Sequence, residues 1–163
     1  MIKILIVCTA NICRSPMGEA ILQNLVEKDG LEEVIEISSG GILGIEGERA
    51  SDFSIAVAKE KGLNLESHRS QGVTSDVINA SDLVLCMTID QAEKLKYMYA
   101  TCHNKIYTLR EYLMEDELFF YSIDDPIGLS LEFYRKIFND IEKEMKRIYP
   151  AIKEKAQTQD NHT

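Results

Sequence analysis

The sequence predicts an α/β fold: a three-layer sandwich in which helices cover both faces of a four-stranded parallel sheet. Short apolar runs rich in β-branched residues alternate with longer segments whose apolar residues recur every three or four positions. The first run, "IKILIV", is almost continuously apolar, which is typical of a parallel strand buried on both faces. Strands that alternate with helices form βαβ units with right-handed crossovers.

The first strand is expected at residues 2–7 and leads, after a short loop, into a helix. Ser15 is a good N-cap, and Pro16 suits the first helical position, where its missing N–H costs nothing. Asp29-Gly30 ends this helix, because glycine is favoured just after a helix C-terminus. The remaining elements alternate in the same way, with strands at 34–38, 83–87 and 106–109 and helices at 50–61 and 90–97.

The last helix has the most regular pattern. From residue 131 onward, apolar side chains recur at steps of three and four residues, which predicts a long amphipathic helix. We expect it to end near Pro150 and the polar tail at 156–163, "AQTQDNHT", to be disordered. Residues 1–155 would then form a single domain, as the length of 163 residues suggests.

Charge limits the partners. The chain has 27 Asp and Glu against 18 Lys and Arg, a formal charge of −9. Nucleic acids and anionic membranes attract proteins with a surplus of basic residues, so neither is an expected partner and any phosphate recognition must be local.

The apolar run near the N-terminus is shorter than a signal-peptide core or a membrane span. We therefore expect a cytoplasmic protein, monomeric or weakly dimeric.

The cysteines and histidines do not suggest a metal site. The chain has four cysteines but no Cys-x-x-Cys pair, and its three histidines lack the spacing of zinc ligands. Structural disulfides are rare in the cytoplasm, so catalytic or buried thiols are the better interpretation. We expect neither a metal ion nor another cofactor.

The polar loop "CTANICRSP" directly follows the first strand. Ligands of parallel sheets bind just beyond the carboxyl ends of the strands, and a tight strand-loop-helix turn directs backbone N–H groups toward a bound anion. These donors and Arg14 would stabilise a thiolate at Cys8, which makes this cysteine a nucleophile. Arg14 can also hold two phosphoryl oxygens at once. The loop therefore favours attack on a bound phosphate ester.

A phosphatase of this kind needs an acid that protonates the leaving group, a contribution of about 10²–10⁴-fold. The segment "SIDDPIGLS" offers Asp124 and Asp125, next to Pro126. Residue chemistry alone leaves both carboxyl groups as candidates.

The loop resembles the signature of the low-molecular-weight protein tyrosine phosphatases, Cys-x-x-Asn-x-Cys-Arg-Ser near the N-terminus. The resemblance extends from Lys3 to about Tyr149: "SSGG" is similar to the family's turn after the second strand, "HRSQ" to its histidine segment and "DLVLCMT" to its third strand. It implies a flavodoxin-like, phosphotyrosine phosphatase I-like fold. It also implies metal-independent hydrolysis of phosphotyrosine in phosphorylated proteins through a cysteinyl-phosphate intermediate.

By this resemblance, Cys8 is the nucleophile, Arg14 a catalytic phosphate-binding residue, and Asp125, in the Asp-Pro pair, the general acid. The phosphate-binding residues would be Thr9, Ala10, Asn11, Ile12, Cys13, Arg14 and Ser15. Ala10 stands where the family usually has glycine.

Four further roles concern the support and protection of the nucleophile. The Ser15 hydroxyl can donate to the Cys8 thiolate. The resemblance implies that Asn11 holds the loop in a strained shape and that His68 supports it through hydrogen bonds. It also makes Cys13 a redox partner that would shield Cys8 from over-oxidation as a disulfide.

The substrate prediction depends on the residues around the loop. Ile127-Gly128 and the aliphatic Leu43 and Ile45 stand where tyrosine phosphatases often have aromatic residues, and "DPIGLS" and "YTLREYL" resemble the branch that includes bacterial protein-arginine phosphatases. That activity, however, goes with a threonine where this chain has Ile12. Isoleucine suits a phenyl ring and cannot hydrogen-bond a guanidinium-linked phosphate. Phosphotyrosine is therefore favoured, with phosphoarginine as the alternative.

Two other functions fit less well. Thioredoxin-linked arsenate reduction uses a similar loop but needs two more cysteines at close spacing; Cys86 lies near the place of the first, whereas Glu93 occupies the second. A non-enzymatic flavodoxin-like domain that binds a phosphorylated cofactor would have a Ser/Thr-rich loop and no use for a nucleophilic thiol beside Arg14.

Overall fold

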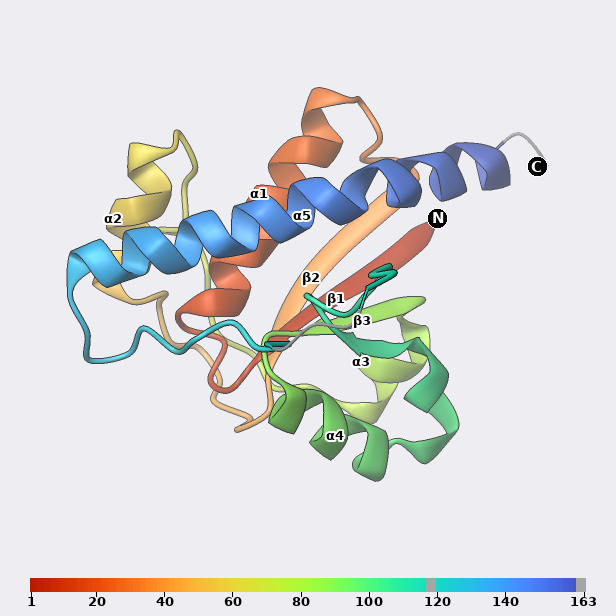
Figure 1. Ribbon diagram of the computed structural model, residues 1–163, viewed down its shortest axis with the longest axis horizontal. Coiled ribbons are helices and arrows are strands. Elements are labelled where there is room, and N and C mark those ends of the chain that lie inside the picture. The colour runs from red at the N-terminus through yellow and green to blue at the C-terminus, as the bar shows by residue number, and fades with distance from the viewer. Residues whose placement is uncertain (117–119, 161–163) are drawn as a thin grey trace.

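A computed structural model describes residues 1–116 and 120–160, and within them four parallel strands form one sheet (Figure 1). The strands lie in the order β2-β1-β3-β4. In the register of the first pair, Ile2 lies opposite Ile35 and Cys8 opposite Gly41. The bounds are β1 (Ile2–Cys8), β2 (Ile35–Gly41), β3 (Leu83–Cys86) and β4 (Ile106–Thr108). The predicted α/β fold with a parallel sheet is confirmed.

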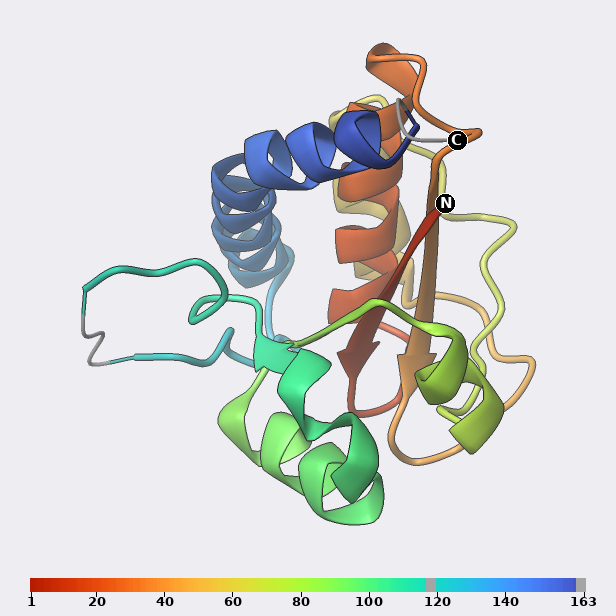
Figure 2. The same cartoon turned by 90° about the vertical axis from the view of Figure 1, so that its right-hand side faces the viewer.

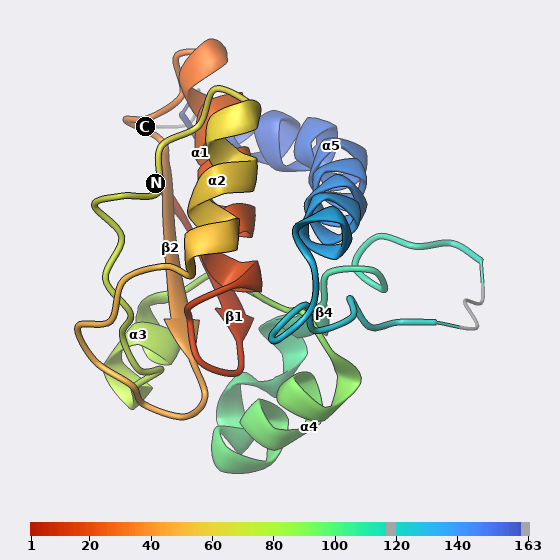
Figure 3. The ribbon, with the colours of Figure 1, turned by 90° about the vertical axis from the view of Figure 1, so that its left-hand side faces the viewer.

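Helices cover both faces of this sheet. Figures 2 and 3 view the molecule from opposite sides, and in both α1 and α5 lie together on one side of the strands and α4 on the other. One layer contains α1 (Arg14–Lys28), α2 (Asp52–Glu60) and α5 (Leu131–Asp160); the other contains α3 (Ser75–Ala80), α4 (Ile89–Met98) and the 3₁₀ helix η1 (Ala100–Lys105). Over residues 1–116 and 120–160, none of the helices combines the length and the apolar character needed to span a membrane.

The central strand β1 is buried on both faces. Ile4 and Ile6 pack into the cluster formed with α1 and α5, whereas Leu5 and Val7 pack into the cluster on the side of α3 and α4. Successive side chains of a strand point to opposite faces, so the strand has no polar side to expose. This explains the apolar run from Ile4 to Val7.

The long helix α5 does not end near Pro150 as predicted; it continues to residue 160. The apolar pattern also continues, because Ile152 and Ala156 are only 4% and 1% exposed. Burial of these side chains offsets the cost of a proline inside a helix, about 3 kcal/mol. The expectation of a disordered tail at 156–163 is therefore wrong up to residue 160, and the residues after it lie outside the described part of the chain.

The start of α1 also differs from the prediction. The helix begins at Arg14, with Cys13 in the N-cap position, and the Cys13 side chain makes no capping hydrogen bond to the helix backbone. Ser15 is therefore the second helical residue and not the N-cap. Its hydroxyl lies instead within hydrogen-bonding distance of the side chains of Cys8 and Asn11, so the serine serves the loop before the helix.

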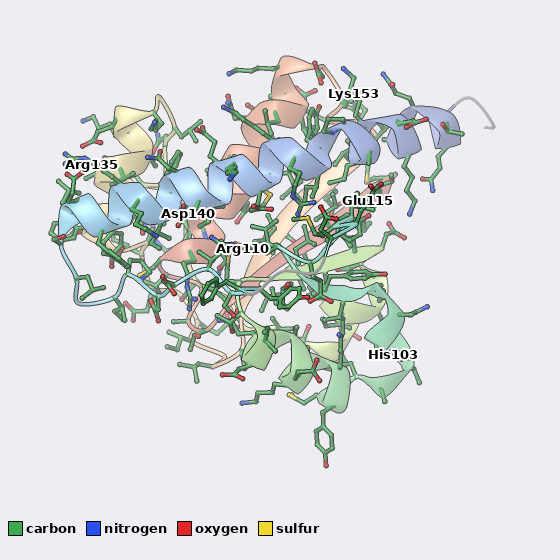
Figure 4. All side chains as sticks on the ribbon, in the orientation of Figure 1. His103, Arg110, Glu115, Arg135, Asp140 and Lys153 are labelled. Atoms are coloured by element: carbon green, nitrogen blue, oxygen red, sulfur yellow. The ribbon has the colours of Figure 1, made fainter. Side chains whose placement is uncertain are left out.

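Polar contacts join α5 to its neighbours near both of its ends (Figure 4). Arg135 forms an ion pair with Glu60 of α2, with an N–O distance of 2.8 Å. Lys153 pairs with Asp29 at the end of α1, at 3.0 Å, and the Tyr149 hydroxyl donates to the same carboxylate at 2.7 Å. Exposed ion pairs contribute little to stability, so the apolar contacts between α1 and α5 hold the layer together.

After β4 the described chain extends away from the sheet, and residues 120–130 lead back to its carboxyl edge (Figure 2). On its return, the Ile123 N–H donates to the Met87 carbonyl at 2.7 Å, and the Ile89 N–H donates to the Ser122 hydroxyl at 3.1 Å. These bonds bring the Asp-Pro pair next to the loop that follows β1.

Candidate active site

The predicted site lies at the carboxyl end of β1. β2 flanks β1 on one side and β3 on the other, so the connections diverge at this point, which is where open α/β sheets bind their ligands. Cys8 is the last residue of β1 and is 2% exposed. Its Sγ lies 2.9 Å from the Ser15 hydroxyl, which can donate a hydrogen bond to a thiolate.

Asn11 fixes the shape of the 8–15 loop. Its φ of 60° lies in the left-handed region, which asparagine tolerates better than most residues. The buried side chain donates to Ser15 at 2.8 Å and to Ser39 at 2.9 Å, and it accepts from the Gln71 N–H at 3.0 Å. The backbone carbonyl of Asn11 lies 2.8 Å from His68 Nε2. Since a carbonyl only accepts, this ring nitrogen carries a proton.

The loop packs directly against the end of β2. A Cβ built on Gly41 would lie 2.7 Å from the Ala10 carbonyl carbon and 2.8 Å from the Asn11 nitrogen. Only glycine allows this approach without movement of the backbone. Ala10 itself has no positive φ, so alanine is accommodated where the family usually has glycine.

Sequence reasoning missed Glu19 and Ser39. The Ser39 hydroxyl donates to the Glu19 carboxylate and accepts from the Asn11 amide. Burial raises the pKa of Glu19, against the lowering effects of the Ser39 hydrogen bond and of His68. The available signal was spacing, because Glu19 lies four residues after Ser15 and therefore on the same face of α1. The network runs from this carboxylate through Ser39 and Asn11 to Ser15.

Arg14 supplies buried positive charge in an acidic protein. It is 3% exposed, and its Nη1 donates to the Ile123 carbonyl at 2.8 Å. Its Nη2 lies 3.4 Å from Asp125 Oδ2 and 3.5 Å from the Thr9 hydroxyl. The Asp125 side chain is 44% exposed and also accepts from the Ile127 N–H, so one carboxylate oxygen faces the guanidinium at the mouth of the loop. The neighbouring Asp124 is exposed.

Cys13 and Ile12 are packed on the inner side of the loop. Cys13 Sγ lies 3.4 Å from the Tyr134 hydroxyl. Burial and this contact raise the pKa of Tyr134 to about 12, so the phenol keeps its proton near neutral pH and can donate to the sulfur. Ile12 is partly buried against the core. Cys8 and Cys13 are both free thiols.

The model of the family described as "Low molecular weight phosphotyrosine protein phosphatase" matches residues 3–158. The chain belongs to this family. Among the relatives of this chain, the "Protein-arginine-phosphatase" of Geobacillus stearothermophilus is 32% identical over 157 residues, which cover 96% of this chain and 97% of the relative. The "Low molecular weight protein-tyrosine-phosphatase PtpB" of Staphylococcus epidermidis is 32% identical over 139 residues, 85% of this chain and 91% of the relative.

Solved structures of low-molecular-weight phosphatases agree with the fold. The YwlE arginine phosphatase from Geobacillus stearothermophilus superposes with a TM-score of 0.86 at 30% identity, covering 97% of both chains. The low-molecular-weight protein tyrosine phosphatase from T. tengcongensis has a TM-score of 0.84 at 28% identity, covering 93% of this chain and 99% of the other. The family predicted from the loop motif is thus confirmed, and the relatives carry two different substrate names.

Proposed function

We propose that this protein hydrolyses phosphotyrosine in proteins through a cysteinyl-phosphate intermediate. One observation carries the proposal: a single loop holds the Cys8 thiol 2.9 Å from a hydroxyl donor and, six residues later, a buried Arg14 whose guanidinium faces Asp125. Nucleophile, anion-binding group and acid are thereby combined at one strand end.

The reaction follows from these groups. The Cys8 thiolate attacks phosphorus while Arg14 and the N–H groups of the loop bind the phosphoryl oxygens. Asp125 donates its proton to the tyrosyl oxygen as the P–O bond breaks. The resulting carboxylate then takes a proton from water, which attacks phosphorus and releases phosphate and the thiolate. Ser15 stabilises this thiolate both before attack and on departure.

Asn11, His68, Glu19 and Ser39 act as positioning residues. Their hydrogen bonds hold the loop in a left-handed turn at Asn11 that would otherwise relax. Cys13 is the proposed redox partner of Cys8. Mild oxidant should remove the thiol reactivity of Cys8 in wild type and in Cys13→Ser, and dithiothreitol should restore it fully in wild type but not in Cys13→Ser, where no disulfide stops further oxidation.

Ile12 favours phosphotyrosine over phosphoarginine. Its side chain has no hydrogen-bonding group to offer a phosphorylated guanidinium. Leu43 and Ile127 are 59% and 65% exposed. Both residues lie next to the proposed site: the Leu43 N–H donates to the carbonyl of Thr9 in the loop, and Ile127 directly follows the Asp125-Pro126 pair. These aliphatic side chains would border an aromatic ring.

Phosphoarginine remains the second candidate because relatives with the name protein-arginine-phosphatase match nearly the whole chain at 28% and 32% identity. Arsenate reduction has less support. Cys86 is fully buried in β3, and this burial raises the pKa of its thiol, which opposes its use as a thiolate in a disulfide relay.

The proposed setting follows from charge and composition. The substrate is a phosphorylated protein, and the formal charge of −9 opposes binding to nucleic acid or to an anionic membrane. We place the protein in the cytoplasm as a monomer or weak dimer.

The test compares phosphate release from phosphotyrosine, phosphoarginine and phosphoserine peptides by wild type, Ile12→Thr and Cys8→Ser. Wild type should act on phosphotyrosine, and Cys8→Ser should bind inorganic phosphate without turnover. Ile12→Thr should gain activity on phosphoarginine. Turnover of phosphoarginine alone by wild type would overturn the substrate assignment, and an active Cys8→Ser would overturn the nucleophile.

A further inference from the structure

Gln91 connects the first turn of α4 to the 8–15 loop. It is 5% exposed, and its Oε1 accepts hydrogen bonds from the backbone N–H groups of Met87 and Thr88, both at 3.0 Å. These two donors determine the orientation of the amide, because the reversed amide would place its NH₂ group against them. The other end of the side chain, Nε2, must therefore be a donor.

This donor reaches the loop at Thr9. Gln91 Nε2 lies 3.0 Å from Thr9 Oγ1, and Arg14 Nη2 approaches the same oxygen at 3.5 Å. A hydroxyl has two acceptor lone pairs and one proton. Gln91 Nε2 and Arg14 Nη2 are both donors and cannot accept a hydrogen bond. The hydroxyl proton of Thr9 must therefore point away from both nitrogens. Among residues 1–116 and 120–160, the structure gives this proton no protein acceptor.

Thr9 lies beside the guanidinium that would bind the anion. Its side chain is partly exposed, and Arg14 Nη2 lies 3.5 Å from its hydroxyl and 3.4 Å from Asp125 Oδ2. A phosphoryl oxygen that accepts a hydrogen bond from Arg14 Nη2 would therefore lie close to Thr9 Oγ1. We propose that Gln91 orients the Thr9 hydroxyl as a hydrogen-bond donor to a phosphoryl oxygen of the bound substrate.

The inference rests on the proposed function, since it requires a phosphate ester to bind beside Arg14. Thr9 then contacts the substrate directly, and Gln91 is a positioning residue that acts through it. The added donor matters because hydrogen bonds to a charged acceptor are stronger than those between neutral groups.

The test begins at Thr9. Thr9→Val removes the hydroxyl and preserves the shape of the side chain, whereas Thr9→Ser keeps the hydroxyl and is the matched control. Thr9→Val should lower kcat/KM for p-nitrophenyl phosphate about tenfold and weaken inhibition by inorganic phosphate by a similar factor. Thr9→Ser should stay within about threefold of wild type in both measurements.

Gln91→Glu tests the orienting role. A carboxylate can still accept from both backbone N–H groups, but it presents an acceptor to Thr9, so the hydroxyl turns toward it and away from the substrate. The new charge also repels phosphate. In the Thr9→Val background only this repulsion remains, so Gln91→Glu should cost several-fold less there than in the presence of Thr9.

The outcomes separate the two proposals. A wild type without activity on any aryl phosphate would overturn the proposed function. If wild type is active but Thr9→Val matches it in kcat/KM and in phosphate inhibition, the substrate contact of Thr9 is overturned and the proposed function stands. An equal loss from Gln91→Glu in both backgrounds would overturn the orienting role of Gln91. Circular dichroism and thermal unfolding verify that each variant is folded.

Discussion

Gly41→Ala offers a quantitative test of how closely the loop must be held. The added Cβ would lie 2.7 Å from the Ala10 carbonyl carbon, 2.8 Å from the Asn11 nitrogen and 3.0 Å from the Ala10 oxygen. Carbon atoms in contact prefer a separation of at least about 3.5 Å, so the loop and the end of β2 must separate by about 0.8 Å. All three atoms belong to backbone and cannot rotate away. A misplacement of about this size can lower the rate of an enzyme about 100-fold, so we expect Gly41→Ala to lose about 100-fold in kcat/KM. The overpacked contact should also lower the free energy of unfolding by about 1–3 kcal/mol.

The assay measures kcat/KM for p-nitrophenyl phosphate, inhibition by inorganic phosphate, and the free energy of unfolding in urea. Gly40→Ala is the matched control, because its Cβ would meet only the Val73 side chain at 3.1 Å and backbone atoms at 3.7 Å. A side-chain methyl group can move, so Gly40→Ala should retain most of the activity. Wild-type kcat/KM and phosphate inhibition in Gly41→Ala would refute the argument that the 8–15 loop depends on this contact.

Three further predictions address the acid, the long helix and the pH dependence of stability. Asp125→Asn should lower kcat/KM, which reports the first step, about 100-fold for phenyl phosphate and much less for p-nitrophenyl phosphate, whose leaving group needs little protonation; equal losses of kcat/KM for the two substrates would contradict the acid role. Pro150→Ala should raise the free energy of unfolding in urea by up to about 3 kcal/mol, and an unchanged midpoint would show that the proline costs α5 nothing. The Tyr149 hydrogen bond and then Lys153 lower the pKa of Asp29 from its usual 3.8, so its contribution to stability is present above that pH and lost as the pH falls through the folded-state pKa. Asp29→Asn should therefore be less stable than wild type at pH 7, and this difference should shrink as the pH falls below 3.8, as a series of urea midpoints over that pH range would reveal.

The spacing of apolar residues predicted the sheet and most of the helices, because elements such as β1 and α5 bury side chains at regular intervals along the sequence. It missed α3 (Ser75–Ala80), whose few residues show too little periodicity to reveal a helix that Thr74 caps. It placed the end of α5 at Pro150, because local rules do not include the burial of Ile152 and Ala156 against distant elements. Tertiary packing decides such boundaries.

The candidate site likewise contains residues that a local sequence motif predicts and residues that only the fold brings together. The signature around Cys8 and Arg14 is contiguous in the sequence, so spacing and resemblance were enough to find it. Gln91 and Ser39 lie on other elements, and only the fold brings them within 3.0 Å and 2.9 Å of Thr9 and Asn11. Residues that orient a site through long-range hydrogen bonds leave no local pattern in the chain.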